Sequence, residues 1–227
     1  LMMNCTEILM AKDKMEEECG VFGIYSKEVN EVAQITYYGL YALQHRGQES
    51  AGISVSNFGE IVTYKGMGLT ADVFTPETLN NLVGNAAIGH VRYSTTGASK
   101  LENAQPLESR YKLGQIAVAH NGNLTNAKII RELLEDAGST FNTSIDSEVI
   151  IKMIARKANG NVEDAIRSTV GAIKGAYALV ILAGNKLVGV RDPYGIRPLC
   201  LGINENGDYI LASESCAIDA VGGTLIR

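Results

Sequence analysis

The sequence predicts an α+β fold in which antiparallel sheets carry helices on their outer faces. Short apolar runs punctuated by glycine occur towards both ends of the chain, and the tight turns between consecutive runs require antiparallel pairing. Helical periodicity is concentrated in the middle, so the regular βαβ order of a parallel sheet is absent. No repeat or low-complexity linker divides the sequence, which indicates one domain.

The expected strands are short runs of mostly apolar residues bounded by turn residues. They cover 21–25, 51–55, 60–64, 86–91, 116–119, 176–183, 186–190, 199–203 and 209–212. Gly184 and Asn185 separate two of these runs by two residues, a typical hairpin signal, and residues 204–208 form a longer loop. Glycine makes up 24 of the 227 residues and proline only 4, so glycine supplies most of the tight turns.

The expected helices carry apolar residues three and four positions apart. They cover 32–43, 76–83, 129–137, 149–154 and 162–173. Thr75 and Pro76 supply an N-cap and a first-turn proline for the second helix, and Gly138 ends the third. Because these helices lie mostly between the two groups of strands, we expect them to cover the sheets from outside.

The composition indicates which kinds of partner the protein lacks and in which compartment it resides. The formal net charge is −5 and no basic tract is present, so nucleic acid is not an expected partner. The longest apolar stretch, 176–183, is far shorter than the ~20 residues of a membrane-spanning helix, so no membrane is expected either. The cysteines (Cys5, Cys19, Cys200 and Cys216) lack CxxC spacing and nearby histidines. This pattern predicts no metal site and reduced thiols in the cytoplasm.

Cys19 opens the first expected strand, directly after three glutamates. Taken alone, it is most simply a small buried thiol. A nucleophilic thiol would need a base, and His45, His90 or His120 could serve, although the local signature of cysteine proteases is missing. If the chain is cut before Cys19, the free α-amine has a pKa of ~8 and can itself accept the thiol proton.

Six segments carry a family resemblance, in order along the chain: Cys19–Ile24, Leu43–Glu49, Gly89–Thr95, His120–Leu124, Asn142–Glu148 and Arg191–Leu199. Together they resemble the glutaminase domain of the glutamine phosphoribosylpyrophosphate amidotransferase (amidophosphoribosyltransferase) family. The resemblance runs from Cys19 to the end of the chain. It implies a four-layer αββα sandwich, two antiparallel sheets flanked by helices, of the N-terminal-nucleophile hydrolase type.

The resemblance implies a covalent glutaminase mechanism. Cys19 would become the mature N-terminus and attack the glutamine carboxamide, forming a thioester. The oxyanion donors map onto the side chain of Asn121 and the backbone N–H of Gly122. Such donors stabilise charge only where it develops in the transition state. From the residues alone, Asn121 and Gly122 could instead form a type I′ turn.

A clamp for the substrate amino acid is also implied by the resemblance. Arg92 would bind the α-carboxylate and Asp146 the α-ammonium, because a guanidinium fork and a carboxylate suit these groups. Further residues expected near the pocket are Tyr93, Thr95 and Arg46. The residues alone leave other interpretations: Arg92 could be a solvated strand end, and Asp146 could close a capping box begun by Thr143. The three histidines are expected to be structural hydrogen-bonding groups, since the α-amine replaces them as base.

The resemblance divides the chain into a leader or propeptide at 1–18 and a glutaminase domain at 19–227, without the family's C-terminal phosphoribosyltransferase domain. The ammonia would serve a longer parent enzyme, which converts phosphoribosylpyrophosphate to 5-phosphoribosylamine in purine biosynthesis. Phosphoribosylpyrophosphate would contact only the missing domain. No cofactor is expected in the glutaminase domain, whereas magnesium and, in some members, an iron–sulfur cluster belong to the parent, expected to be a homo-oligomer.

Two other functions fit the same residues. The first is the glutaminase domain of another class II amidotransferase, of the glucosamine-phosphate or asparagine synthase type. Those enzymes usually expose their cysteine by removing only the initiator Met, whereas eighteen residues precede Cys19 here. The second is a glutamine-binding module kept inactive by its uncut leader.

Overall fold

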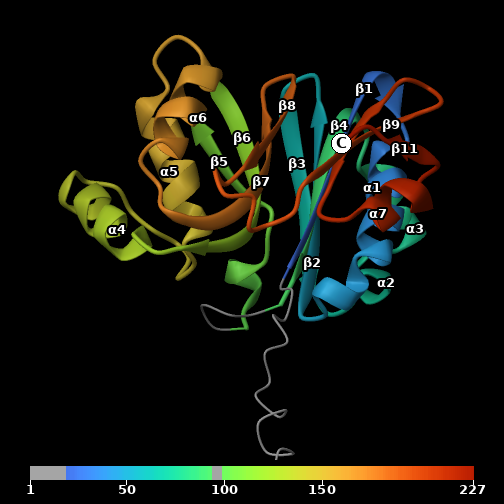
Figure 1. Ribbon diagram of the computed structural model, residues 1–227, viewed down its shortest axis with the longest axis horizontal. Helices are drawn as coiled ribbons and strands as arrows, with labels where there is room; N and C mark the ends of the chain where they lie inside the picture. Colours follow the sequence, from blue (N-terminus) through green and yellow to red (C-terminus); the bar gives the residue numbers. More distant parts are fainter. Residues whose placement is uncertain (1–18, 94–98) are drawn as a thin grey trace, which may run out of the picture.

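Two antiparallel sheets lie face to face, and helices cover the outer face of each (Figure 1). The computed structural model describes residues 19–93 and 99–227, so the expected leader at 1–18 and Thr95 lie outside the described residues. The expected α+β class and four-layer αββα sandwich are confirmed.

The larger sheet has seven strands in the order β11-β9-β10-β1-β4-β2-β3. Its strands are β1 (Gly20–Asn30), β2 (Ser50–Asn57), β3 (Glu60–Met67), β4 (Gly84–Arg92), β9 (Cys200–Asn204), β10 (Tyr209–Ala212) and β11 (Gly223–Leu225). The helices on its outer face are α1 (Val32–Ala42), α2 (Thr70–Val73), α3 (Pro76–Asn81) and α7 (Ser215–Ala220). The 3-10 helix η2 (Gln44–Arg46) follows α1 and leads into β2.

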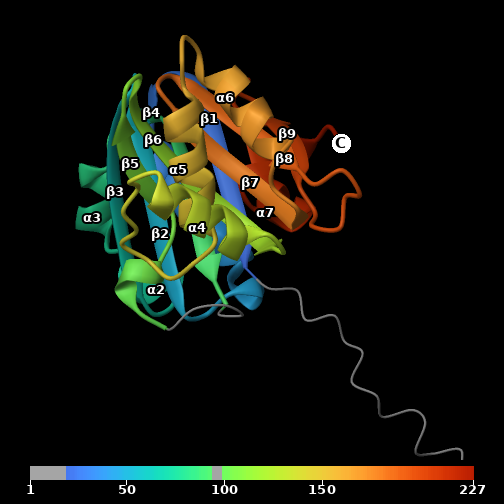
Figure 2. The same cartoon turned by 90° about the vertical axis from the view of Figure 1, so that its left-hand side faces the viewer.

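The smaller sheet has four strands in the order β5-β6-β7-β8. Its strands are β5 (Leu107–Tyr111), β6 (Gly114–Leu124), β7 (Gly175–Ala183) and β8 (Lys186–Arg191). The helices on its outer side are α4 (Ala127–Asp136), α5 (Ser147–Lys157) and α6 (Val162–Val170), which face the viewer in Figure 2. The short 3-10 helix η3 (Leu101–Asn103) precedes β5.

Alternation of side chains along β1 explains how one sheet serves two cores. Phe22 and Ile24 pack against the outer helices, whereas Val21 faces the smaller sheet. Between the sheets, Val21 shares a fully buried cluster with Ala119 and Val180. A third cluster fills the space between the smaller sheet and its helices. Each pair of adjacent layers in the sandwich therefore has its own hydrophobic cluster.

Several local expectations can be compared with the structure. Thr75 caps α3 as expected, since its Oγ1 accepts from the Thr78 N–H at 3.2 Å. The turn interpretation of Asn121 and Gly122 is wrong, because both residues lie inside β6 and pair with β7. The capping-box interpretation of Asp146 is also wrong, because α5 begins at Ser147 and no side-chain cap bond forms.

Candidate active site

Cys19 lies at the start of β1, beside the end of β4. Its Sγ is 3.4 Å from the backbone carbonyl oxygen of Tyr93 and 3.5 Å from the Tyr93 nitrogen. The predicted pocket residue Tyr93 therefore meets the thiol through its backbone, while its side chain is exposed. Cys19 has a φ of +64°, a left-handed conformation that costs a non-glycine residue roughly 1–2 kcal/mol. The strained backbone conformation thus lies at the candidate nucleophile itself.

Arg46 binds the backbone of Cys19. Its guanidinium is fully buried, and Nε donates to the Cys19 carbonyl at 2.7 Å. Nη1 forms an ion pair with Glu214, whose carboxylate also lies 3.1 Å from His45 Nε2. Sequence reasoning expected Arg46 near the substrate; the structure engages its guanidinium with the nucleophile's own backbone and with Glu214.

The pKa of Glu214 reflects this position. Burial alone would raise it, but hydrogen bonds from Arg46 and His45 outweigh burial and lower the pKa below its ordinary value. Glu214 is therefore a carboxylate at neutral pH and balances the buried charge of Arg46. Sequence reasoning missed Glu214, because 168 residues separate it from Arg46 and no local pattern links them.

Asn121 and Gly122 lie near the C-terminal end of β6, in the smaller sheet. The Asn121 side chain is completely buried, yet within the described residues neither its Nδ2 nor its Oδ1 has a hydrogen-bond partner. Buried amides are nearly always hydrogen-bonded, so this one is suited to a ligand. Gly122 has a φ of +139°, and a Cβ there would lie 2.0 Å from the Ala176 carbonyl oxygen. Only glycine fits this position.

The two sheets meet at this end of the sandwich. His90 on β4 is fully buried, and its Nε2 donates to the carbonyl of His120 on β6 at 3.0 Å. Burial lowers the pKa of His90 to about 3, so the imidazole is neutral and Nε2 carries its proton. His90 is two residues from Arg92, and His120 directly precedes Asn121. This contact therefore joins the strand ends that carry the candidate site residues.

The two clamp residues differ in their surroundings. Arg92 is only 3% exposed, so the solvated strand-end interpretation is wrong, and its Nη1 lies 3.3 Å from Glu49 Oε1. Asp146 accepts from the Leu124 N–H at 2.8 Å, and its Oδ1 is 3.5 Å from His120 Nδ1. Burial raises the pKa of Asp146, but the His120 imidazole and the Leu124 N–H more than offset this and lower it. Asp146 is thus held as a carboxylate, as binding of an ammonium group requires.

Each of the three histidines bonds to a group other than the thiol. His45 pairs with Glu214, and His90 donates to a backbone carbonyl. His120 Nδ1 lies 3.0 Å from Ser147 Oγ and near Asp146. These contacts support the expectation that the histidines are structural.

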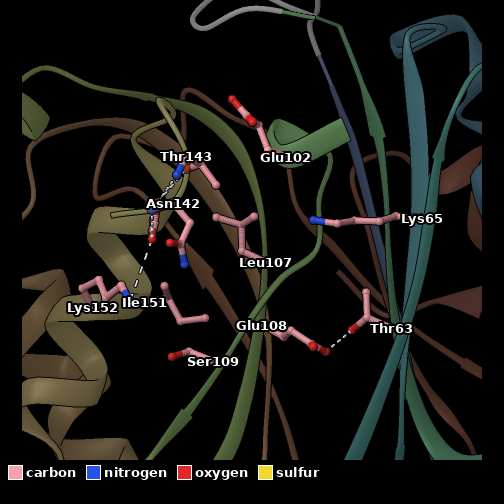
Figure 3. A pocket seen from close by; sticks show the side chains of 11 residues that line it. Thr63, Lys65, Glu102, Leu107, Glu108, Ser109, Asn142, Thr143, Ile151 and Lys152 are labelled. Carbon is pink, nitrogen blue, oxygen red and sulfur yellow. Dashed lines mark hydrogen bonds and ion pairs between the residues drawn. The ribbon is translucent and has the colours of Figure 1, made fainter. Parts of the chain in front are cut away.

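A separate cavity of about 360 Å³ opens on the side of the sandwich, between β3, β5 and α5 (Figure 3). Lys65 and Lys152 reach it from opposite walls. Glu148 accepts from the Asn142 and Thr143 N–H groups at 3.0 and 2.7 Å, which fixes the loop that leads to Asp146. The cavity is lined by none of the residues that sequence reasoning placed in the site.

Two further observations concern only residues 19–93 and 99–227. No group of three or more His, Cys, Asp or Glu side chains in these ranges is arranged to hold a metal ion. Every helix within the same ranges is too short or too polar to cross a membrane.

Comparisons with known proteins agree with this geometry. A family described as "Glutamine amidotransferase domain" matches residues 90–220. The amidophosphoribosyltransferase of Synechocystis is 49% identical over 95% of this chain, which covers 44% of that relative. The phosphoribosylpyrophosphate amidotransferase of Bacillus subtilis, solved with ADP and GMP, superposes with a TM-score of 0.85 at 45% identity, over 92% of this chain and 45% of that one.

A second solved structure, described as the allosteric regulatory enzyme of purine biosynthesis, gives a TM-score of 0.86 at 46% identity, over 92% of this chain and 44% of that one. The chain thus spans less than half the length of the relatives it matches. The site geometry, the matched family and these likenesses agree: the chain belongs to the glutamine amidotransferase domain family.

Proposed function

We propose that the chain hydrolyses glutamine to glutamate and ammonia through a thioester on Cys19. The observation that carries this proposal is the buried Asn121 amide, which has no partner within the described residues and lies on the strand joined to β4. An unpaired buried polar group costs about 1–3 kcal/mol, and binding of an oxyanion would remove the part of this cost that belongs to the Asn121 Nδ2–H donors.

The proposed reaction has two halves. In the first, Cys19 Sγ bonds to the carboxamide carbon while the α-amine of Cys19 takes the thiol proton. Asn121 Nδ2–H and Gly122 N–H stabilise the oxyanion, the α-ammonium returns the proton to the leaving nitrogen, and the C–N bond breaks to release ammonia. In the second half, water attacks the thioester and gives a proton to the α-amine. The C–S bond then breaks, the α-ammonium returns the proton to the Cys19 thiolate, and glutamate leaves.

Arg46 would orient the base as well as the nucleophile. The Cys19 nitrogen donates to the Arg46 carbonyl oxygen at 3.0 Å, and the same bond would hold the nitrogen of a free amine beside its own thiol. Asp146 and Arg92 would hold the α-ammonium and α-carboxylate of glutamine, with Tyr93 and Thr95 nearby. None of these steps requires a metal or redox cofactor, so a chelator should leave the glutaminase rate unchanged.

Maturation at Cys19 is part of the proposal. A φ angle is defined by the preceding carbonyl carbon, so cleavage before Cys19 abolishes the left-handed constraint together with its strain. We propose that residues 1–18 are a leader and that residues 19–227 form the glutaminase.

The larger role follows from the relatives. Those named amidophosphoribosyltransferase are more than twice as long as the matched region, and their names favour that activity over other class II amidotransferases. We propose that the parent is a cytoplasmic homo-oligomer that passes this ammonia to phosphoribosylpyrophosphate, yielding 5-phosphoribosylamine. Its magnesium, and any iron–sulfur cluster, would reside outside the glutaminase.

The test is ammonia release from glutamine by three cysteine variants. Cys19→Ala should abolish turnover, whereas Cys200→Ala and Cys216→Ala should retain it, because only Cys19 lies at the start of β1 beside Tyr93. Full activity in Cys19→Ala would refute the proposal. Glutamine binding without ammonia release by the mature wild-type chain would favour the inactive binding module.

A further inference from the structure

The end of β6 that carries Asn121 has a neighbouring strand on one side only. β5 pairs with β6 only as far as Leu107 opposite Val118, whereas β7 continues beyond that point and places Leu179 opposite His120. His120 is 2% exposed, so its backbone groups on the side of β5 would be costly to leave unpaired.

Gln105 takes the place of the missing strand. Extending the β5–β6 register by two residues puts Gln105 opposite His120. The Gln105 side chain supplies both bonds: Oε1 accepts from the His120 N–H at 2.9 Å, and Nε2 donates to the His120 carbonyl at 3.3 Å. A side-chain amide has the same donor and acceptor as a peptide group, so it continues the ladder by one step.

Two neighbours hold this arrangement in place. The buried His90 donates to the same His120 carbonyl, so that oxygen accepts from two side chains. Gly52 gives the Gln105 backbone room, because a Cβ at Gly52 would lie 2.2 Å from the Gln105 carbonyl oxygen. Gln105 itself is only 5% exposed. The Gln105 side chain is therefore held in one position by the residues around it.

We propose that Gln105 is a positioning residue for glutamine hydrolysis, which fixes the backbone directly before Asn121 and so aims the oxyanion donors of Asn121 and Gly122. This inference rests on the proposed function of those two residues. Donors act on a transition state only when they are already in place, and misplacement by about 1 Å can cost ~10²-fold in rate. Gln105 does not touch the substrate, so its effect should fall on kcat rather than on KM.

The chain offers a matched control at the other end of β6. Gln115 forms the same pair of bonds to a strand backbone: its Oε1 accepts from the Ile61 N–H at 3.0 Å, and its Nε2 donates to the Ile61 carbonyl at 3.2 Å. Six residues of strand, roughly 20 Å, separate Gln115 from Asn121. A variant at Gln115 loses the same hydrogen bonds but leaves the candidate site alone.

The experiment compares Gln105→Met with Gln115→Met in the chain matured to begin at Cys19. Single-turnover ammonia release measures thioester formation, and calorimetry measures the affinity for glutamate. Gln105→Met should slow thioester formation by ~10-fold or more, with KM for glutamine and the affinity for glutamate within twofold of wild type. Gln115→Met should also lower the melting temperature, by less because Gln115 is only partly buried, and should leave thioester formation within twofold.

Equal rates of thioester formation in the two variants would overturn the inference, as would a loss at Gln105 that appears only in KM. If Gln105→Met does not fold, Gln105→Glu keeps the acceptor for the His120 N–H and loses the donor to its carbonyl, and the same comparison applies. Asn121→Ala separates the two claims. A fully active Asn121→Ala would refute the proposed function, whereas a slow Asn121→Ala beside a fast Gln105→Met refutes only the role of Gln105.

Discussion

Arg46 contacts Cys19 at both of its backbone groups. The Arg46 carbonyl oxygen accepts from the Cys19 nitrogen at 3.0 Å, and the Arg46 Nε donates to the Cys19 carbonyl at 2.7 Å. One residue therefore sets the position of the nucleophile and the direction of its α-nitrogen. Glu214 completes the arrangement by neutralising the buried guanidinium.

The Arg46–Glu214 ion pair should make the free energy of unfolding depend on pH in the acid range. Because the folded pKa of Glu214 lies below its ordinary 4.5, its contribution is present above pH 4.5 and is lost as the pH falls through the lower, folded value. Glu214→Gln should lower the free energy of unfolding by about 1.5–3 kcal/mol at pH 7, with the difference from wild type shrinking towards pH 3. Urea unfolding at several pH values measures this.

Glu163→Gln is the matched control for Glu214→Gln. Glu163 pairs with Lys186 at the surface and holds no buried charge, so its loss should change stability little at any pH. A pH-independent effect of Glu214→Gln, or one no larger than that of Glu163→Gln, would contradict the role given to Glu214.

Asn121→Ala should separate activity from stability. The rate of glutamine hydrolysis should fall ~10²–10³-fold, as is usual when one oxyanion donor is removed. Stability should change little, because the lost packing is offset by removal of a buried amide that has no partner within the described residues. Turnover kinetics and urea unfolding of the same preparation measure both.

Asn85→Ala provides the opposite pattern to Asn121→Ala. Asn85 is equally buried, but its amide bonds the Phe58 N–H and the Ser26 carbonyl, at the far end of β4 from Arg92. This variant should lose about 1–3 kcal/mol of stability and keep its kcat. If Asn121→Ala is destabilised as much as Asn85→Ala and remains active, Asn121 is a structural residue.

The clamp residues should affect substrate affinity. Arg92→Leu and Asp146→Asn each remove one charge-assisted contact worth about 1.5–3 kcal/mol, so KM for glutamine should rise roughly 10- to 100-fold. Because the pKa of Asp146 is held below its ordinary 3.8, KM of the wild-type chain should not rise between pH 7 and pH 5 through this group. Unchanged glutamine affinity in both variants, measured by calorimetry, would make these residues structural.

Most of the fold could be predicted from side-chain patterns. The strand expected over 21–25 and the Thr75 cap are local signals that the structure confirms. Strands β5 and β11 were not expected, because β5 is short and largely polar and β11 has only three residues. Both form by pairing with neighbouring strands, β6 and β9. Asn121 and Gly122 look like a turn locally, but pairing with β7 overrides that preference.

Less of the candidate site could be predicted from sequence patterns. Cys19, Arg92 and Asp146 came from the family resemblance, since no spacing rule joins residues so far apart. The residues that support them, Glu214 and Gln105, gave no signal at all. Their roles depend on contacts across 168 and 15 residues of sequence, which only the folded chain defines.

The most direct measurement compares glutamine hydrolysis by the intact chain and by a chain that begins at Cys19. With residues 1–18 attached, the Cys19 nitrogen is an amide and cannot act as a base; removal of the leader supplies the α-amine. We expect steady ammonia release from the chain that begins at Cys19 and almost none from the intact chain, with intact mass confirming each species. Equal rates would show that the α-amine of Cys19 is not the base and would assign that role to one of the three histidines.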